Sequence, residues 1–241
     1  MSVMNPKTEY NLVKTDNHKN YFVKDLWVVI PAHNEEKRIR VVLCSLKKYT
    51  KNIIVVDDGS TDSTYDIVCD QDVICLRHIV NFGKGSALKT GCDFALKMGA
   101  KFMVVMDADG QHRVEDIPKL IAHLFEDNND IVFGVRTWNQ NMPTIFKIGN
   151  IILSKYVGFM FRIKISDTQS GFRAFTSVAY KKIRWDATDY SMESEMIARA
   201  GKNRLKYAQE KIKTIYLDRY KGTTIIDGIK VALSMLFWKM R

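Results

Sequence analysis

Two aspartates, Asp107 and Asp109, stand two positions apart at the end of the apolar run 102–106. In an extended backbone, side chains at positions i and i+2 leave the same face, so the two carboxylates can share one hard cation such as Mg²⁺ or Mn²⁺. Two carboxylates in a solvated turn are the alternative for any single Asp-x-Asp. Because unpaired carboxylates at a buried strand end are costly, the pattern favours the metal site.

Polar residues also follow two other apolar runs. Segment 31–36 reads Pro-Ala-His-Asn-Glu-Glu, and segment 57–62 reads Asp-Asp-Gly-Ser-Thr-Asp. A helix cap accounts for one or two of the acceptors in the second segment. Capping does not account for all of the acidic groups, so we expect several of them to converge on one rim of the fold.

Segment 81–87 has a composition that could bind an anion. It reads Asn-Phe-Gly-Lys-Gly-Ser-Ala and precedes a helical pattern. Its glycines allow close backbone approach, the helix start supplies N–H donors, and Lys84 supplies positive charge, so it could hold a phosphate or a base edge. A tight strand-to-helix turn with an exposed lysine explains the same residues equally well.

The elements that must position these residues follow from the hydrophobic pattern. Short apolar runs alternate with longer segments of helical spacing, which predicts an α/β fold with a mostly parallel sheet covered by helices. In such sheets ligands bind beyond the carboxyl ends of the strands, where the polar segments lie. The predicted strands are Leu26–Ile30, Ile53–Val56, Val73–Leu76, Phe102–Met106 and Ile131–Phe133.

The chain has 241 residues, which is enough for one catalytic domain with appendages. Its opening stretch is polar and lacks the apolar core of a signal peptide. Four cysteines form no CxxC pair, and we expect them to be reduced and buried thiols in the cytoplasm. The longest charge-free apolar stretch near the end, 231–238, is far shorter than the roughly 20 residues of a membrane-spanning helix.

Taken together, the motifs resemble those of the family 2 glycosyltransferases and, within them, of the dolichol-phosphate mannosyltransferase-like polyprenyl-phosphate glycosyltransferases. The resemblance runs from about Trp27 to Gly222. Seven motifs in order carry it: Pro31-Ala32-His33-Asn34-Glu35, Asp57-Asp58-Gly59-Ser60, Asn81-Phe82-Gly83-Lys84-Gly85, Asp107-Ala108-Asp109-Gly110-Gln111-His112, Gly134-Val135-Arg136, Asp167-Thr168-Gln169-Ser170-Gly171-Phe172-Arg173 and Asp218-Arg219.

The resemblance implies a GT-A, Rossmann-like fold with helices on both faces of the sheet. It implies a polar tail over 1–22, a catalytic domain over 23–222 and an amphipathic C-terminal helix over 223–241. It also implies a donor site for a nucleoside-diphosphate sugar, in which Glu35 accepts hydrogen bonds from ribose and either Asp57 or Asp58 faces the base. The full implied donor set is Pro31, Asn34, Glu35, Asp57, Asp58, Lys84, Asp107, Ala108 and Arg219.

The family pattern assigns Asp107, Asp109 and Gln111 to the metal and diphosphate cluster, with Asp109 among the catalytic residues. A metal held there, with diphosphate oxygens as its other ligands, would neutralise charge on the departing nucleoside diphosphate. Arg219 would clamp the donor phosphates as a guanidinium.

For the acceptor, the resemblance indicates a polyprenyl or dolichyl phosphate held by Arg136, Lys147 and Arg173. Arg136 could instead be a solvated arginine, and Arg173 an internal ion pair with Asp167 or Glu195. Asp167 is a candidate general base. A phosphate acceptor is already mostly dianionic at neutral pH, so Asp167 could orient groups rather than remove a proton.

Two positions depart from the family pattern. Lys147 stands where an arginine is frequent, which keeps the charge but loses bidentate geometry. Ile225 follows Thr224 where a Ser-Lys pair is frequent, which removes one cation.

The net charge of +10 is unevenly distributed along the chain. Residues 1–135 carry 17 basic and 19 acidic side chains, whereas residues 136–241 carry 20 and 8. Such asymmetry indicates an anionic partner for the second part.

Segment 146–161 and the segment after Thr224 combine apolar helical spacing with basic flanks, which favours peripheral contact with the cytoplasmic face of a membrane. Helices that simply cover the sheet are the alternative, and no nucleic-acid module is recognised.

The sequence therefore predicts an inverting glycosyltransferase that moves a sugar, mannose or glucose, onto a polyprenyl phosphate. Two alternatives remain. The first is the same chemistry on a hydroxyl acceptor in glycan or polysaccharide synthesis, and the second is a non-catalytic nucleotide-sugar-binding subunit.

Overall fold

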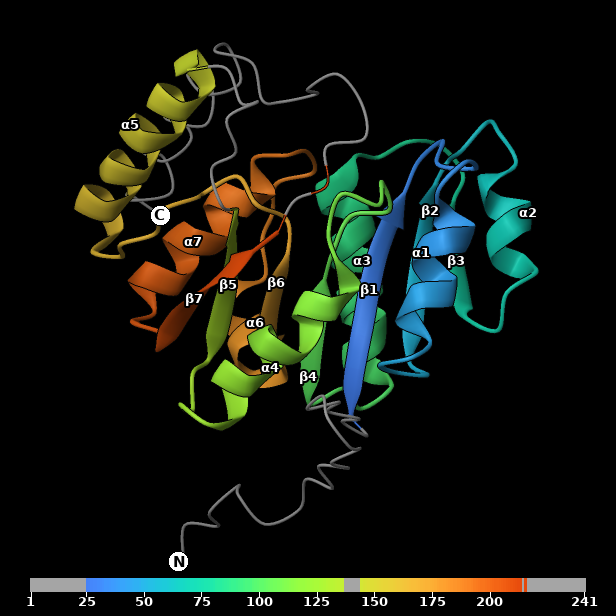
Figure 1. Cartoon of the computed structure of the whole chain (residues 1–241), viewed down its shortest axis with the longest axis horizontal. Helices are drawn as coiled ribbons and strands as arrows, with labels where there is room; N and C mark the ends of the chain where they lie inside the picture. The colour runs from blue at the N-terminus through green and yellow to red at the C-terminus, as the bar shows by residue number, and fades with distance from the viewer. Residues whose placement is uncertain (1–24, 137–143, 214, 216–241) are drawn as a thin grey trace, which may run out of the picture.

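The computed structural model describes residues 25–136, 144–213 and 215, with some side chains at the start of one helix left out (Figure 1). The predicted tail 1–22, the predicted helix 223–241 and Arg219 lie outside the described residues. The strands are β1 (Leu26–Ala32), β2 (Ile53–Asp58), β3 (Ile74–His78), β4 (Phe102–Val105), β5 (Ile131–Arg136), β6 (Arg173–Thr176) and β7 (Tyr207–Ile212). The helices are α1 (Ile39–Leu46), α2 (Thr64–Cys69), α3 (Lys84–Lys97), α4 (Ile117–Phe125) after a 3₁₀ turn η2 (Val114–Asp116), α5 (Thr144–Phe161), α6 (Ser177–Ile183) and α7 (Met192–Lys202).

The strands form one seven-stranded sheet in the order β3-β2-β1-β4-β6-β5-β7. All neighbouring pairs are parallel except the two that involve β6, which runs antiparallel to β4 and to β5. The mostly parallel sheet is therefore confirmed, while β6 and β7 were absent from the strands expected from the hydrophobic pattern. Both were missed because they are short or polar: β6 has four residues, and β7 reads Tyr-Ala-Gln-Glu-Lys-Ile.

Helices cover both faces of the sheet, as expected. One core packs α3, α6 and α7 against Val29, Ile54 and Val56, and the other packs α1 and α4 against Val28 and Ile30. Because both faces are covered, every residue of β1 is buried, and its sequence is an apolar run rather than an alternation. Figure 1 shows α5 beyond the β7 edge of this layered body, next to α7.

The carboxyl ends of β1, β2 and β3 meet at one rim, since these strands are parallel and in register. Ala32 pairs with Asp57, and Asp58 pairs with His78. This register brings the loops after β1 and β2 side by side.

The cysteines are unpaired, as expected, although only Cys92 is buried, and Cys44 and Cys69 are exposed. No helix in the described ranges is long and apolar enough to cross a membrane.

Candidate active site

The centre of the site is an ion-pair array on Asp107, directly after β4. The Lys84 Nζ atom lies 2.6 Å from Asp107 Oδ1 and 2.9 Å from Glu193 Oε1. On the other side, His112 Nε2 lies 3.4 Å from Asp107 Oδ2. The array joins the end of a central strand to the first residue of α3 and the start of α7.

Burial and charge set the protonation of this array. Burial by itself opposes the charged forms of Asp107 and Lys84, but their mutual attraction is stronger, so the pKa of Asp107 is lowered and that of Lys84 is raised. The pKa of Asp109 is raised, first by burial and then by the Asp107 charge. Lys84 is therefore an ammonium and Asp107 a carboxylate at neutral pH.

The donor chemistry at this position suits a hard divalent cation. Asp109 follows Asp107 by two residues, its Oδ1 accepts a hydrogen bond from the Gln111 N–H at 2.9 Å, and the buried His112 Nδ1 has no hydrogen-bond partner. In the part of the chain that the structure describes, no three His, Cys, Asp or Glu side chains gather as a metal-binding group. The protein would thus supply part of a coordination sphere that water or phosphate oxygens complete.

The chain after β7 passes the same cluster. The Ile215 N–H donates to the Gln111 carbonyl at 3.0 Å. Ile215, the last described residue, therefore lies beside the loop that carries the aspartates.

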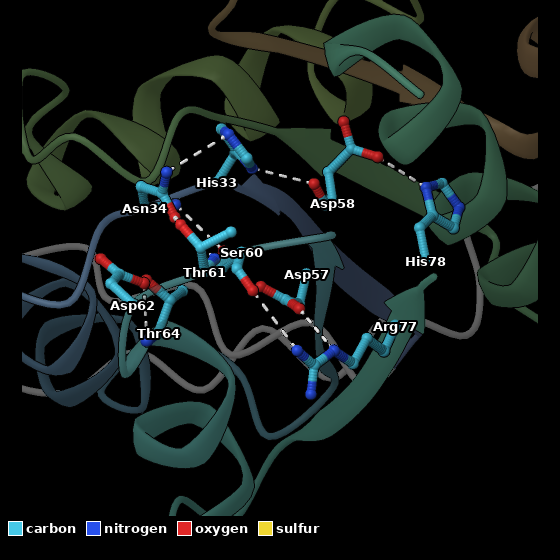
Figure 2. Close-up of polar contacts among 10 residues, drawn as sticks. All are labelled: His33, Asn34, Asp57, Asp58, Ser60, Thr61, Asp62, Thr64, Arg77 and His78. Carbon is cyan, nitrogen blue, oxygen red and sulfur yellow. Dashed lines mark hydrogen bonds and ion pairs between the residues drawn. The ribbon is translucent and has the colours of Figure 1, made fainter. Parts of the chain in front are cut away.

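The loops after β1 and β2 brace one another at the rim where these strands end (Figure 2). The Asn34 N–H donates to Ser60 Oγ, and Asn34 Oδ1 accepts from the Thr61 N–H at 2.9 Å. The Glu35 N–H donates to Thr64 Oγ1 at 2.7 Å. Asn34 adopts a φ of +55°, a conformation that asparagine tolerates better than most residues. These contacts fix the backbone of Asn34 and Glu35, while the Glu35 carboxylate pairs with Arg38 at 3.1 Å and Pro31 is buried in β1.

Asp57 and Asp58 have different environments, although they are neighbours. Asp58 Oδ1 accepts from His78 Nδ1 at 2.7 Å and from the Phe82 N–H, and its Oδ2 accepts from the Gly83 N–H at 2.8 Å. Asp57 is fully buried and lies 3.2 Å from the Arg77 guanidinium, yet neither of its oxygens accepts a hydrogen bond (Figure 2). Asp58 therefore fixes the 81–83 loop, whereas both carboxylate oxygens of Asp57 could still accept a hydrogen bond.

The Gly-Lys-Gly segment is a close-packed turn. A Cβ at Gly85 would clash with the carbonyl of Ala187 and lie 2.8 Å from the Thr188 carbonyl carbon. The Ser86 N–H donates to the Thr188 carbonyl, and Trp185 Nε1 donates to the Gly85 carbonyl at 2.8 Å. The glycines therefore admit the protein's own 187–188 loop, and the side chain of Lys84 is 13% exposed rather than open to solvent.

Arg136 and Asp167 form a two-point ion pair at the end of β5. The Arg136 Nε and Nη2 atoms donate to the two carboxylate oxygens at 2.7 and 3.0 Å, and the Gln169 N–H also donates to Asp167. Burial opposes the charged form of Asp167, but the arginine outweighs it and lowers the pKa of this carboxyl. Asp167 is thus a poor base that holds a guanidinium in place.

Arg173 is an internal residue, although we expected it at an acceptor phosphate. It is 1 % exposed and donates to three backbone carbonyls, of Ser170, Glu193 and Thr168. The expected alternative was an ion pair with Asp167 or Glu195, but the Nε, Nη1 and Nη2 atoms of Arg173 donate to carbonyls instead. Its role in the described structure is to tie segment 168–170 to the start of α7. Lys147 lies in α5, and its side chain is outside the described residues.

The sequence reasoning missed Glu193 as a member of the site. Glu193 lies about 85 residues beyond Asp107 in a segment without a motif, so no local spacing connects them. The one signal was a pair of acids, Glu193 and Glu195, in the first turn of a helix that carries Arg199 and Lys202 in its last turn. Glu195 takes the structural part instead, since it accepts from the N–H groups of Asp186 and Ala187.

Comparison with known proteins identifies the family. Residues 27–184 match the family model described as Glycosyl transferase family 2. The chain belongs to this family. It is 40% identical to the uncharacterized protein MJ1222 of Methanocaldococcus jannaschii, over 94% of this chain and 98% of that protein. It is 36% identical to the UDP-N-acetylglucosamine–dolichyl-phosphate N-acetylglucosaminyltransferase of Methanococcus voltae, over 90% of this chain and 97% of the relative.

The fold of this chain is also seen in a solved structure. Glucosyl-3-phosphoglycerate synthase from Mycobacterium tuberculosis, in complex with Mn²⁺, uridine diphosphate and phosphoglyceric acid, superposes with a TM-score of 0.70. The match covers 90% of this chain and 78% of that one at 18% identity. The expected GT-A architecture and the resemblance to polyprenyl-phosphate glycosyltransferases are thereby confirmed.

Proposed function

We propose that this family 2 glycosyltransferase moves a sugar from a nucleoside-diphosphate donor onto a dolichyl or polyprenyl phosphate, with inversion at the anomeric carbon. The Methanococcus voltae relative, named for that class of acceptor, supports the acceptor assignment. Inversion follows from direct attack of the acceptor phosphate opposite the departing diphosphate.

The observation that carries the acceptor class is the state of Asp167. A hydroxyl acceptor needs a base to take its proton, and a base needs a pKa near the working pH. The Arg136 pair lowers the pKa of Asp167 and occupies both of its oxygens. A phosphomonoester needs no base, because its second pKa of about 6 leaves it mostly dianionic at neutral pH. A guanidinium held by a carboxylate is a suitable partner for that dianion.

One short segment connects the acceptor cation to the donor carboxylates. Asp167, at the start of segment 167–171, holds Arg136, and Gly171, at its end, lies against Asp107 and Lys84. A Cβ at Gly171 would come within 2.9 Å of Lys84 Nζ and 3.1 Å of Asp107 Oδ2. The proposed acceptor and donor groups are thus fixed to the same piece of backbone, which limits their relative movement.

On the donor side, we assign Asp57 to the base, Glu35 to the ribose, and Asp107 with Asp109 to a Mg²⁺ or Mn²⁺ ion, alongside Gln111. The bound cation would supply Lewis-acid stabilisation of the diphosphate leaving group. Asp57 is the better reader of a base N–H because its acceptor oxygens are not used by hydrogen bonds within the described protein, whereas those of Asp58 are.

The test is sugar transfer by the purified full chain. UDP-N-acetylglucosamine, UDP-glucose and GDP-mannose are supplied in turn with Mn²⁺ or Mg²⁺, and a short polyprenyl phosphate is compared with the matching polyprenol. The name of the Methanococcus voltae relative makes UDP-N-acetylglucosamine the first donor to try, beside the glucose and mannose expected from the sequence. We expect glycolipid from the phosphate alone, with a β linkage from an α-linked donor by NMR. Equal transfer to polyprenol, or no transfer from any donor, contradicts the proposal.

We also propose that α5 rests on a membrane surface, at the cytoplasmic face that we expect from the sequence. Its inner side is anchored by the buried Val157 and Phe161, while Ile152 and Phe159 are exposed, Phe159 by 83%. Exposed apolar side chains on a helix with basic neighbours favour anionic lipid. Phe159→Ser should weaken co-sedimentation with anionic vesicles, and Met98→Ser, at an exposed apolar residue of the α3 C-cap, should not. Equal binding by both variants contradicts this role for α5.

A further inference from the structure

Lys84 has two carboxylate partners that belong to different parts of the chain. Asp107 follows the central strand β4, and Glu193 begins α7. The Glu193 side chain is 3% exposed and that of Lys84 is 13% exposed, so water contributes little to their solvation. One carboxylate is enough to neutralise one ammonium. Glu193 also faces the charge of the buried Arg173, yet the ion pair that it forms in the described structure is with Lys84, so its carboxylate lies between two cations.

The second oxygen of Glu193 adds to this. Glu193 Oε2 is buried without a hydrogen-bond partner, although a carboxylate normally has its acceptor sites filled when it leaves water. Leaving such an acceptor unsatisfied destabilises the folded protein. A residue placed here only to anchor α7 would be expected to use both oxygens, as Glu195 does two positions later.

Lys84 and a divalent cation compete for the same atoms. The ammonium lies 2.6 Å from Asp107 Oδ1, which is a direct contact. A cation bound by Asp107 would need that carboxylate and would repel the ammonium strongly at such short range. Repulsion from the cation would weaken the contact of Lys84 with Asp107 and draw the ammonium toward its other partner, Glu193. Without a second carboxylate, Lys84 would become a buried ammonium short of counter-charge, which is costly.

We propose that Glu193 is a positioning residue that retains Lys84 when a divalent cation replaces it on Asp107. Lys84 then keeps a charged partner in both states, and the cation does not have to displace a lysine from its only counter-ion. Held on Glu193, the ammonium stays beside the diphosphate position instead of moving away. This inference rests on the proposed function, because it takes Asp107 and Asp109 as the metal site.

Mn²⁺ binding to the full chain without any donor tests the proposal by isothermal titration calorimetry. Glu193→Gln should weaken Mn²⁺ binding by at least about fivefold, because Lys84 then has Asp107 as its one carboxylate and competes harder for it. Lys84→Met should tighten Mn²⁺ binding, because the competing ammonium is gone. A purely structural pair would not move the two affinities in opposite directions.

Two further variants separate positioning from bulk charge. In the Lys84→Met background, Glu193→Gln should change Mn²⁺ affinity by less than about twofold, since the effect requires the lysine. Glu193→Asp retains the charge and should bind Mn²⁺ close to the wild-type affinity. Glu115→Gln is the matched control, because it removes one exposed acid that pairs with Arg113 outside the array, and it should leave Mn²⁺ binding unchanged. Thermal unfolding of each variant checks its folding.

The outcomes distinguish this inference from the proposed function. If Glu193→Gln weakens Mn²⁺ binding equally with and without Lys84, the effect is one of bulk charge and the inference is overturned. Weaker or unchanged Mn²⁺ binding in Lys84→Met also overturns it. The Lys84→Met measurement stands even where Glu193→Gln does not fold. If the wild type transfers sugar and binds Mn²⁺ while the variants give either of these two results, the proposed function stands and only the inference fails. Wild-type protein that does neither overturns both.

Discussion

At the scale of single residues, the site is a set of charges whose partners decide their roles. Asp57 and Asp58 are adjacent, but Asp58 is saturated by His78 and two backbone N–H groups, whereas Asp57 keeps acceptor oxygens. Asp167 likewise acts through Arg136. Residue type alone does not separate a binding aspartate from a structural one, because the difference lies in which donors reach it.

With a UDP-sugar as the donor, Asp57→Asn should weaken binding of UDP by roughly tenfold, since a charge-assisted hydrogen bond to the base becomes a neutral one. Asp58→Asn should instead lower the melting temperature, because an amide supplies one acceptor oxygen where the carboxylate supplies two. Calorimetric titration with UDP and thermal unfolding of both variants check the contrast. Unchanged UDP affinity in Asp57→Asn would sink the assignment of this residue to the base.

Arg136→Lys should raise the KM for polyprenyl phosphate by about tenfold while UDP affinity stays constant, because lysine keeps the charge but loses two-point pairing with Asp167. Steady-state kinetics with varied acceptor and a UDP titration measure the two effects. A change in UDP affinity with an unchanged acceptor KM would place Arg136 on the donor side instead.

At the scale of elements, segment 167–172 between α5 and β6 organises the site. It holds Arg136 at its start and contacts Asp107 and Lys84 at Gly171. Arg173 donates to the carbonyl of Thr168 in this segment and to that of Glu193 in α7, which links the two. The antiparallel β6 follows at once and pairs with both β4 and β5. The segment is thereby fixed between the strand that carries Asp107 and the strand that carries Arg136.

Gly171→Ala should lower kcat by at least about tenfold, since the added methyl group would press on the Lys84–Asp107 pair and small displacements at a reacting centre are costly. Gly149→Ala is the control, because outside its own helix backbone no described atom lies within 4 Å of the place that its added methyl group would occupy, and alanine favours the helix α5. Kinetics and thermal unfolding of both variants test this. A wild-type kcat in Gly171→Ala would show that Lys84 and Asp107 accommodate the added methyl group, which contradicts this prediction.

At the scale of the whole molecule, a polar contact holds the β7 edge of the sheet, opposite the β3 edge. His123 of α4 bonds Asp127 at 2.7 Å and Glu210 of β7 at 3.1 Å. These hydrogen bonds, first that to Asp127, outweigh partial burial and raise the pKa of His123. The imidazole thus links the helix layer to the last strand.

The contribution of His123 to stability should depend on pH. Its folded pKa lies above its unfolded value of about 6.5, so the stabilisation is fully present below pH 6.5 and is lost as pH rises through the folded pKa. The melting temperatures of wild type and His123→Gln should therefore differ most in acid and converge at higher pH. Thermal unfolding from pH 5.5 to 8.5 measures the difference, and a constant or growing gap contradicts it.

The sequence by itself determined the alternation of strands and helices, the family, and the residues that meet at the rim. Those features are local, because apolar runs specify parallel strands and motifs such as Asp107-Ala108-Asp109 end them. The tertiary structure decided which groups are partners. Glu193 reached Lys84, Arg173 turned inward and β6 ran antiparallel through contacts between segments far apart in the chain. Hydrogen bonds and ion pairs act over a few ångströms in space, and sequence spacing does not encode those distances.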